Sequence, residues 1–253
     1  MKTRTKIKEK DHSGNSFSLT FALVKKINRS IYMISTDLKY KAVLFDLDGT
    51  LINSLQDIAD SMNRVLASYG FSTHGYEDYR LFIGKGLKNL SERALPENKK
   101  DEETINAVFH DLMKDYARNV VKKTVLYNGI PELLDKLVER NILLAILSNK
   151  AHELTISIAE KIISKWNFEV IMGSKDGIPR KPDPSGALIC CKELGVLPEQ
   201  ILYLGDSGID MQTATAAGMF PVGVTWGFRG REELLEKGAK FIIDQPVQLL
   251  ELL

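Results

Sequence analysis

The sequence contains little cysteine: of its 253 residues only Cys190 and Cys191 are cysteines, and they are adjacent. Adjacent cysteines form no ordinary structural disulfide without unusual local geometry, which excludes a fold held by disulfides. A protein without structural disulfides suits a reducing compartment, and we expect a cytoplasmic location. We interpret the pair as small apolar residues of a buried helix, and a redox role is the alternative.

Long apolar runs are also absent. The longest, Ile142–Leu147, is far shorter than the about 18 residues that a membrane-spanning helix requires. The formal net charge of +1 provides no general attraction to nucleic acid or acidic lipid. We therefore expect neither a membrane nor a nucleic acid as partner, while the oligomeric state stays open. The four histidines show no His-Glu-x-x-His spacing, which excludes that zinc motif.

The first part of the chain, residues 1–38, differs from the rest because lysine and arginine dominate its charge. Its short apolar run, Phe17–Val24, is followed at once by Lys25 and Lys26, a pattern that does not fit a secretory signal. We predict a mobile basic extension, with a targeting peptide as the alternative. Met33 is an alternative start, and a chain beginning there is expected to fold and work like the full chain.

The most informative stretch is Lys41–Thr50. The apolar run Ala42–Phe45 predicts a buried parallel strand. It ends in two acids, Asp46 and Asp48, and the Gly-Thr pair that follows starts a loop. Ligands of open α/β sheets bind outside the carboxyl ends of strands, so this strand brings two carboxylates to a binding edge.

Two carboxylates this close repel each other unless a cation or a shared proton relieves them. Mg²⁺ is typically held by one or two carboxylates, waters and phosphate oxygens. The pair therefore indicates metal-assisted phosphoryl chemistry, with one Asp as nucleophile and the other as acid/base. A plain turn after a strand is the alternative. An EF-hand is disfavoured because Leu51 and Ile52 supply no further side-chain oxygen.

The region from residue 54 to residue 124 has helical periodicity and no strand-like run. Ser54 is expected to cap its first helix, with Asp57 in the first turn. Such an all-helical insertion in an α/β chain predicts a separate small domain. Its Gly84-Lys85-Gly86 stretch lacks a nucleotide-binding pattern, and we interpret it as a flexible loop that faces the active site.

After residue 124, strands alternate with helices, with strands expected at 142–147, 168–172 and 201–204. This order predicts a parallel sheet covered on both faces. The predicted fold is α/β, with a Rossmann-like parallel sheet core at 39–53 and 125–253 and an inserted small all-helical cap domain at 54–124.

Polar side chains recur where predicted strands end. Taken singly, each could be a helix cap or a solvated side chain, but turns do not require the whole ordered set. The set consists of Asp46 and Asp48, Ser148 and Asn149, Lys181, and Asp206 and Asp210.

This ordered set resembles the four signatures of the haloacid dehalogenase-like superfamily, over residues 40–253. The resemblance implies Mg²⁺ held by Asp46, the backbone carbonyl of Asp48, and Asp206. It also implies a role for each position: Asp46 as nucleophile, Asp48 as general acid/base, Ser148 with its neighbour Asn149 as ligands of the phosphoryl group, Lys181 as the cation that neutralises nucleophile and phosphate, Asp206 as metal ligand and Asp210 as its supporting acid.

Within the superfamily, the helical insertion and the stretches Tyr127–Leu134 and Val224–Arg229 resemble bacterial phosphoglycolate phosphatases. The resemblance implies a Mg²⁺-dependent phosphomonoester hydrolase that acts through an aspartyl phosphate on 2-phosphoglycolate or a similar small phosphorylated metabolite. Lys85 is then expected near the carboxylate of the substrate. The alternatives are a pyrophosphatase, a β-phosphoglucomutase, a phosphonoacetaldehyde hydrolase or, in a different class, a non-catalytic phosphate-binding regulatory module. A dehalogenase is disfavoured because that branch generally lacks the second acid, here Asp48.

Overall fold

The structure is a computed structural model that describes residues 39–253, so the predicted basic extension and the alternative start at Met33 lie outside the described residues. Its strands are β1 (Ala42–Phe45), β2 (Ile52–Asn53), β3 (Val125–Leu126), β4 (Leu143–Ala151), β5 (Val170–Ser174), β6 (Ile201–Gly205), β7 (Phe220–Val224) and β8 (Phe241–Ile243). Its described helices are α2 (Leu55–Ser68), α3 (Tyr76–Phe82), α4 (Leu87–Ala94), α5 (Glu102–Asn119), α6 (Ile130–Glu139), α7 (His152–Ile162), α8 (Ser185–Leu194), α9 (Gly208–Ala216) and α10 (Arg231–Glu236). Short 3-10 helices lie at Glu97–Lys99, Pro198–Gln200 and Pro246–Leu252.

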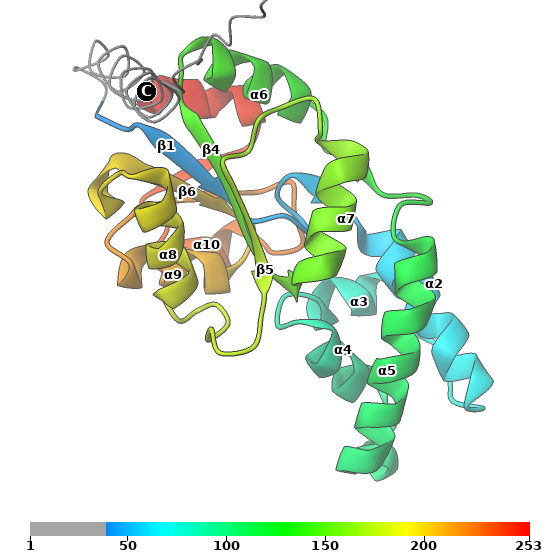
Figure 1. The fold of residues 1–253 in the computed structure, drawn as a ribbon. Helices are drawn as coiled ribbons and strands as arrows, with labels where there is room; N and C mark the ends of the chain where they lie inside the picture. Colours follow the sequence, from blue (N-terminus) through cyan, green and yellow to red (C-terminus); the bar gives the residue numbers. More distant parts are fainter. Residues whose placement is uncertain (1–38) are drawn as a thin grey trace, which may run out of the picture. The chain divides into compact units, whose positions relative to one another are not determined.

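Six strands form one parallel sheet in the order β5-β4-β1-β6-β7-β8 (Figure 1). Strand β1 lies inside the sheet, paired with β4 on one side and with β6 on the other. The chain thus moves outward from β1 in both directions, which makes the carboxyl end of β1 the topological switch point. Ligands of open α/β sheets bind in the crevice at such a point. Asp46 follows β1 directly, at this crevice.

Helices cover both faces of the sheet, with α8 and α9 on one side and α6 and α7 on the other (Figure 1). On the α8 side, strand residues such as Leu44 and Tyr203 pack in one buried cluster with Ala187 and Cys190 of α8. Both cysteines are free and buried, which confirms their interpretation as packing residues. The predicted α/β fold with a parallel sheet is confirmed.

The helical segment, defined here as residues 54–124, contains α2–α5 and no strand. It lies between β2 and β3, which pair antiparallel with Ile52 opposite Leu126. The stretch that enters the helical segment and the stretch that leaves it therefore lie side by side. Within the segment, α5 packs against α2 and α4, and its buried face includes Leu112 and Tyr116.

The return from the helical segment to β3 is fixed by Asp57 of α2. Its buried carboxylate accepts hydrogen bonds from the backbone N–H groups of Lys122, Lys123 and Thr124 at 2.8–3.0 Å. The Thr124 hydroxyl donates a further bond at 2.6 Å. Hydrogen bonds to a charged acceptor are stronger than neutral ones, so Asp57 holds together the two ends of the segment.

Three local predictions differ from the structure. Ser54 lies at the N-cap of α2, but its hydroxyl accepts no hydrogen bond from a backbone N–H of the helix. It donates to Asp48 Oδ1 at 2.5 Å. Strand β4 continues past its predicted end at Leu147 to Ala151, because the polar residues in between are buried beside the crevice. Strand β5 begins at Val170, later than predicted.

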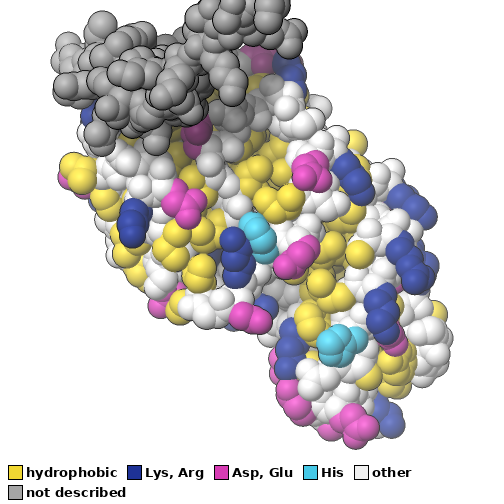
Figure 2. Space-filling model, in the orientation of Figure 1, with side chains coloured by type: hydrophobic (Ala, Val, Ile, Leu, Met, Phe, Trp, Pro, Cys, Tyr) yellow, Lys and Arg dark blue, Asp and Glu magenta, His cyan; other side chains and the backbone are white. Residues whose placement is uncertain are grey.

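The surface carries charges of both signs. On the face drawn in Figure 2, Lys and Arg side chains are interspersed with Asp and Glu side chains over both the sheet region and the helical segment. In the described part of the chain, no helix is long and apolar enough to span a membrane.

Candidate active site

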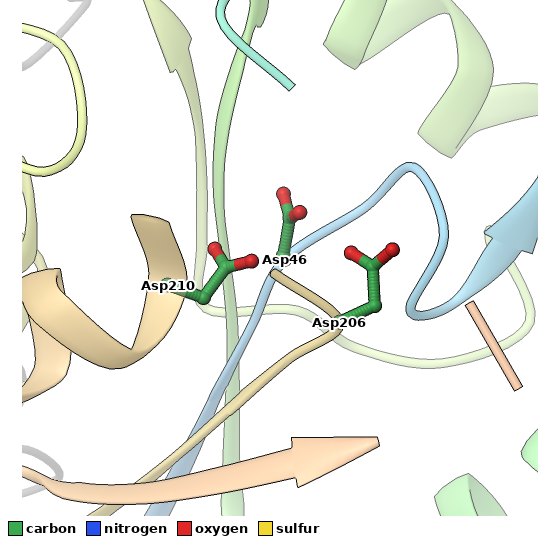
Figure 3. A group of neighbouring side chains, drawn as sticks. All are labelled: Asp46, Asp206 and Asp210. Atoms are coloured by element: carbon green, nitrogen blue, oxygen red, sulfur yellow. The ribbon is translucent and has the colours of Figure 1, made fainter. Parts of the chain in front are cut away.

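Three carboxylates meet at the switch point. Asp46 follows β1, Asp206 follows β6, and Asp210 lies in the first turn of α9. Each offers one oxygen, and these oxygens lie within 4.8 Å of one another. Figure 3 shows the three carboxyl groups turned toward a common space beyond the strand ends. Parallel strands end at the same edge, and this brings together acids that are far apart in the sequence.

Lys181 lies among these acids. Its ammonium is 2.8 Å from Asp46 Oδ1 and 2.7 Å from Asp210 Oδ1. It also donates to the backbone carbonyl of Leu147, at the end of the apolar part of β4, at 3.1 Å. The side chain is only 4% exposed. A buried ammonium with three acceptors is fixed in place, so Lys181 presents a stationary positive charge beside Asp46.

Asp210 is fully buried, and the contacts of its carboxylate are internal. Oδ1 accepts from Lys181 and from the Tyr203 hydroxyl, and Oδ2 accepts from the hydroxyl and N–H of Ser207. These contacts use both oxygens. The arrangement fits the supporting role that the resemblance implies for Asp210, because it orients Lys181 and the β6–α9 turn.

Asp206 is held against glycine backbone. Its Oδ2 accepts the Phe228 N–H at 2.7 Å, and within residues 39–253 no hydrogen bond reaches Oδ1. A Cβ on Gly49 or Gly227 would collide with the Asp206 side chain. Gly49 also has φ +88°, in the left-handed region that favours glycine. Both glycines are therefore required by the position of Asp206.

The electrostatics of the cluster favour a cation. Burial, and then repulsion from Asp210, raise the pKa of Asp46 well above its usual value, although Lys181 opposes the shift. The same two causes raise the pKa of Asp206 to about 7. Burial disfavours the charged form of Lys181, yet the carboxylates of Asp210 and Asp46 raise its pKa well above the usual value. One lysine thus does not compensate three buried acids, and a bound divalent cation would relieve the remaining repulsion.

The residues present fit a hard divalent cation. All candidate donors are oxygens, which suit Mg²⁺ and not a soft metal. Because both Asp210 oxygens are occupied, Asp46 and Asp206 are the side chains with capacity to bind an ion. The coarse expectation of an acidic metal-binding cluster is supported by the grouping of the Asp46, Asp206 and Asp210 carboxylates. The predicted contribution of the Asp48 backbone carbonyl stays a prediction.

Asp48 belongs to a second group. Its side chain is 11% exposed, and its Oδ1 accepts hydrogen bonds from the Ser54 hydroxyl at 2.5 Å and from the Lys150 ammonium at 2.6 Å. Asp48 and Asp46 line the same cavity. The two acids of the β1 loop are thus each paired with a different buried lysine.

Ser148 and Asn149, predicted to bind the phosphoryl group, are buried at the end of β4 and line the same cavity. The amide of Asn149 is already engaged. Its Oδ1 accepts the Lys181 N–H at 2.9 Å, and its Nδ2 donates to the carbonyls of Lys181 and Gly84 at 3.1 Å. The geometry gives Asn149 a positioning role that joins the Lys181 loop to the helical segment.

The cavity has a volume of about 40 Å³, room for a few water-sized groups. Around it, the helical segment contributes Ile58, Ile83, Gly84, Gly86, Leu87 and Leu90. The predicted substrate contact Lys85 is exposed and does not line the cavity, whereas the glycines on both sides of it do. The structure gives the Lys85 assignment no support, because the backbone at this loop faces the cavity and the side chain faces solvent.

No site role was predicted for five residues outside the helical segment that line the cavity: Lys150, Ser207, Ile209, Phe228 and Arg229. Lys150 could have been found, because it lies two residues after Ser148 on the same strand, where side chains return to one face. The Arg229 guanidinium donates to the carbonyls of Leu81 at 3.1 Å and Ile83 at 2.7 Å in the helical segment. No local pattern indicates that contact, which joins positions about 148 residues apart.

Comparison with known proteins gives consistent matches. A family model described as haloacid dehalogenase-like hydrolase matches residues 43–224. The phosphoglycolate phosphatase of Haemophilus influenzae is 31% identical over 221 residues, covering 85% of this chain and 99% of the relative. That of Pseudomonas syringae pv. tomato is 30% identical, covering 83% of this chain and 78% of the relative. A crystal structure of a predicted phosphoglycolate phosphatase from Haemophilus somnus superposes with a TM-score of 0.79 at 28% identity, covering 85% of this chain and 98% of that one.

Proposed function

This chain belongs to the haloacid dehalogenase-like hydrolase family, and from that premise we propose that it is a Mg²⁺-dependent phosphatase of small phosphorylated metabolites, with 2-phosphoglycolate as the first candidate substrate. The observation that carries the proposal is Lys181, which bridges Asp46 and Asp210 in the cavity that Asp48 and Asp206 also line. A non-catalytic phosphate-binding module would not need two acids of the β1 loop that are each paired with a separate buried lysine.

In the first half of the proposed reaction, an Asp46 oxygen attacks phosphorus as the bond to the ester oxygen breaks. Asp48 donates its proton to the departing oxygen. Lys181 offsets the negative charge that nucleophile and phosphoryl group bring together. The Ser148 hydroxyl, at the cavity wall, donates to a phosphoryl oxygen.

In the second half, Asp48 takes a proton from water, which attacks the phosphorus of the aspartyl phosphate. The bond to Asp46 breaks, free phosphate leaves, and both carboxyl groups return to their starting states. Asp46, Asp206 and the Asp48 backbone carbonyl would hold Mg²⁺. The ion would supply positive charge that lets the substrate dianion approach a carboxylate.

The lining of the cavity supports a small monophosphate. In the described chain, the helical segment contributes only apolar side chains and glycines to it, so the segment offers no lysine for a Schiff base. This disfavours phosphonoacetaldehyde as substrate. The first turn of α4 begins at Gly86 and Leu87 on the cavity wall. Its unpaired N–H groups favour a carboxylate beside the phosphate.

We propose that the helical segment acts as the cap predicted from the sequence, with the core at 39–53 and 125–253. Hydrogen bonds join the core and the helical segment at several points. Asn149 donates to Gly84, Arg229 donates to Ile83, and Arg80 of the segment donates to the Gly227 carbonyl at 2.8 Å. A segment held over the strand ends excludes bulk water and limits the size of the leaving group. Cytoplasmic location stays a prediction, to which the free cysteines lend support.

The proposal is tested by assaying the purified full chain with Mg²⁺ against 2-phosphoglycolate, pyrophosphate, β-glucose 1-phosphate and p-nitrophenyl phosphate. We expect EDTA to abolish turnover, Mg²⁺ to restore it, and kcat/KM to be highest for 2-phosphoglycolate. A preference of tenfold or more for another substrate, about 1.4 kcal/mol in transition-state binding, would reject phosphoglycolate while leaving the phosphatase mechanism intact. Hydrolysis of none of the esters would reject the mechanism as well.

A further inference from the structure

Lys150 is a buried cation that the proposed reaction does not use. Its side chain is 2% exposed, at the end of β4. Its ammonium lies 2.6 Å from Asp48 Oδ1 and donates to the Tyr116 hydroxyl at 2.8 Å. Burial disfavours its charged form, yet Asp48 and Tyr116 raise the pKa of Lys150 above the usual value for lysine. Lys150 therefore keeps its positive charge at neutral pH, directly beside the Asp48 carboxyl group.

Stability does not explain this arrangement. A buried ion pair gains little over an apolar pair of similar size, because both groups lose their hydration. Lys150 could also bind phosphate directly, since it lines the cavity, but its nearest partner is the acid that exchanges protons. Its place beside Asp48 indicates that it acts on the position of this carboxylate.

The two oxygens of Asp48 differ in their surroundings. Oδ1 accepts from both Lys150 and Ser54, whereas within residues 39–253 no hydrogen bond reaches Oδ2. An oxygen held by a cation and a hydroxyl is a poor site for a proton. Oδ2 is therefore the oxygen left to exchange a proton in the proposed reaction, and the two donors to Oδ1 fix the direction in which Oδ2 points.

Lys150 itself depends on the helical segment. Tyr116 belongs to α5 and is fully buried, and burial raises the pKa of its hydroxyl to about 12, so this group stays neutral and keeps its proton. The ammonium thus joins a side chain of the β1 loop to a side chain of α5. The ammonium also lies 4.9 Å from the centroid of the Tyr116 ring. Removing the Tyr116 hydroxyl would take away one of the two hydrogen-bond acceptors of Lys150 in the described residues and leave this ring contact in place.

We propose that Lys150 is a positioning residue for Asp48, and that Tyr116 completes its hydrogen bonds, so that proton transfer at Asp48 requires α5 to be seated on the sheet. This inference rests on the proposed function and adds to it the residues that aim the acid/base group.

The test measures kcat/KM for a series of phosphate monoesters whose leaving alcohols range from p-nitrophenol to alkyl alcohols such as glycolate. For this parameter, proton donation matters most when the leaving group is a strong base. We expect Lys150→Met to lower kcat/KM for 2-phosphoglycolate by about 30-fold and for p-nitrophenyl phosphate by about threefold at most. A direct role in phosphate binding would lower every ester by the same factor, and that result would overturn the proposal.

A second arm shows whether Lys150 acts through Asp48. In the Asp48→Asn background, Lys150→Met should change kcat/KM for 2-phosphoglycolate by less than about twofold. If the loss of kcat/KM in the double variant equals the product of the losses in the two single variants, Lys150 and Asp48 act independently. That result would contradict the proposal.

The third arm uses a change that preserves packing. Tyr116→Phe should lower kcat/KM for 2-phosphoglycolate by about fivefold, the size of one hydrogen bond, with little change for p-nitrophenyl phosphate. Tyr79→Phe is the matched control, because this tyrosine is also fully buried in the helical segment and its hydroxyl donates to Asn63 instead, at 2.6 Å. If kcat/KM depends on the leaving group to the same extent in Tyr116→Phe and Tyr79→Phe, the proposed role of Tyr116 is wrong.

The outcomes separate the two levels of the proposal. If circular dichroism shows that Lys150→Met does not fold, the comparison of Tyr116→Phe with Tyr79→Phe tests the inference alone. If the wild type hydrolyses the esters but the leaving-group dependence is unchanged in Lys150→Met and Tyr116→Phe, only this inference fails. If the wild type hydrolyses none of them, the proposed function fails and the inference fails with it.

Discussion

At the residue scale, two buried lysines divide the acids at the sheet edge into two groups. Lys181 holds Asp46 and Asp210, and Lys150 holds Asp48. An isolated buried charge is costly, whereas a paired and hydrogen-bonded one is tolerated. The division gives the two acids of the β1 loop different surroundings, which is what a nucleophile and an acid/base group require.

Glycine at position 49 is expected to be essential for the metal site. Gly49→Ala places a Cβ against Asp206, and displacing a group at a metal site weakens metal affinity by about 10- to 100-fold. We expect the Mg²⁺ concentration for half-maximal activity to rise by at least about tenfold. Gly70→Ala is the control, because Gly70 also has positive φ (+72°) but no atom within 4 Å of the added Cβ. An equal Mg²⁺ requirement in both variants would show that Asp206 is not held by this contact.

Residue-scale prediction from the sequence succeeded where strand ends decide position. Asp46 and Asp206 directly follow β1 and β6, where the parallel-sheet rule places them. The prediction for Lys85 finds no support in the cavity lining, because a loop sequence does not indicate whether backbone or side chain faces a cavity. Residue-scale prediction also missed the Lys150–Tyr116 contact, because that contact depends on how α5 packs against the sheet.

At the element scale, the structure is organised by β1 and by the paired strands β2 and β3. Strand β1 places the acids at the switch point. The pairing of β2 with β3 brings the start and the end of the helical segment together. The helices of the segment were predictable from their periodicity. The role of Asp57 was not, because its partners lie 65–67 residues further along the chain.

Asp57→Ala is expected to destabilise the protein. The substitution removes the acceptor of several charge-assisted hydrogen bonds and leaves buried donors of Thr124 without a partner, at a cost of about 3 kcal/mol in the free energy of unfolding. Urea denaturation measures the loss. Asp60→Ala, one turn later on α2, removes an exposed pair with Lys123 and should cost less than about 1 kcal/mol. Equal losses would show that Asp57 does not anchor the segment.

At the scale of the whole molecule, the acidic cluster links stability to pH and to metal. The pKa of Asp206 is 3.8 ordinarily and about 7 in the folded chain, so between these values the folded state binds more protons than the unfolded state. The stability contributed by this group therefore falls as pH rises from about 4 to about 7 in metal-free protein. A cation that binds the deprotonated carboxylates reverses that loss.

Mg²⁺ is thus expected to raise the melting temperature of the full chain more at pH 8 than at pH 5. At saturating Mg²⁺ and pH 8 the rise should reach about 5 °C, and it should be much smaller at pH 5 because the ligands are protonated. Asp206→Asn should remove most of the rise at pH 8. A melting temperature that does not respond to Mg²⁺ at either pH would rule out the proposed metal site.

The central claim is that Asp46 carries the phosphoryl group, and Asp48→Asn tests it most directly. With p-nitrophenyl phosphate, whose leaving group needs little protonation, this variant should still transfer the phosphoryl group but lack the base that activates water. Rapid mixing with Mg²⁺ should release about one equivalent of p-nitrophenolate per enzyme molecule in a burst. Mass spectrometry of the acid-quenched protein should then find a phosphoryl group on the peptide containing Asp46, and none in the Asp46→Asn variant. Steady hydrolysis by the wild type, with no burst and no phosphorylated Asp46 in Asp48→Asn, would contradict the claim.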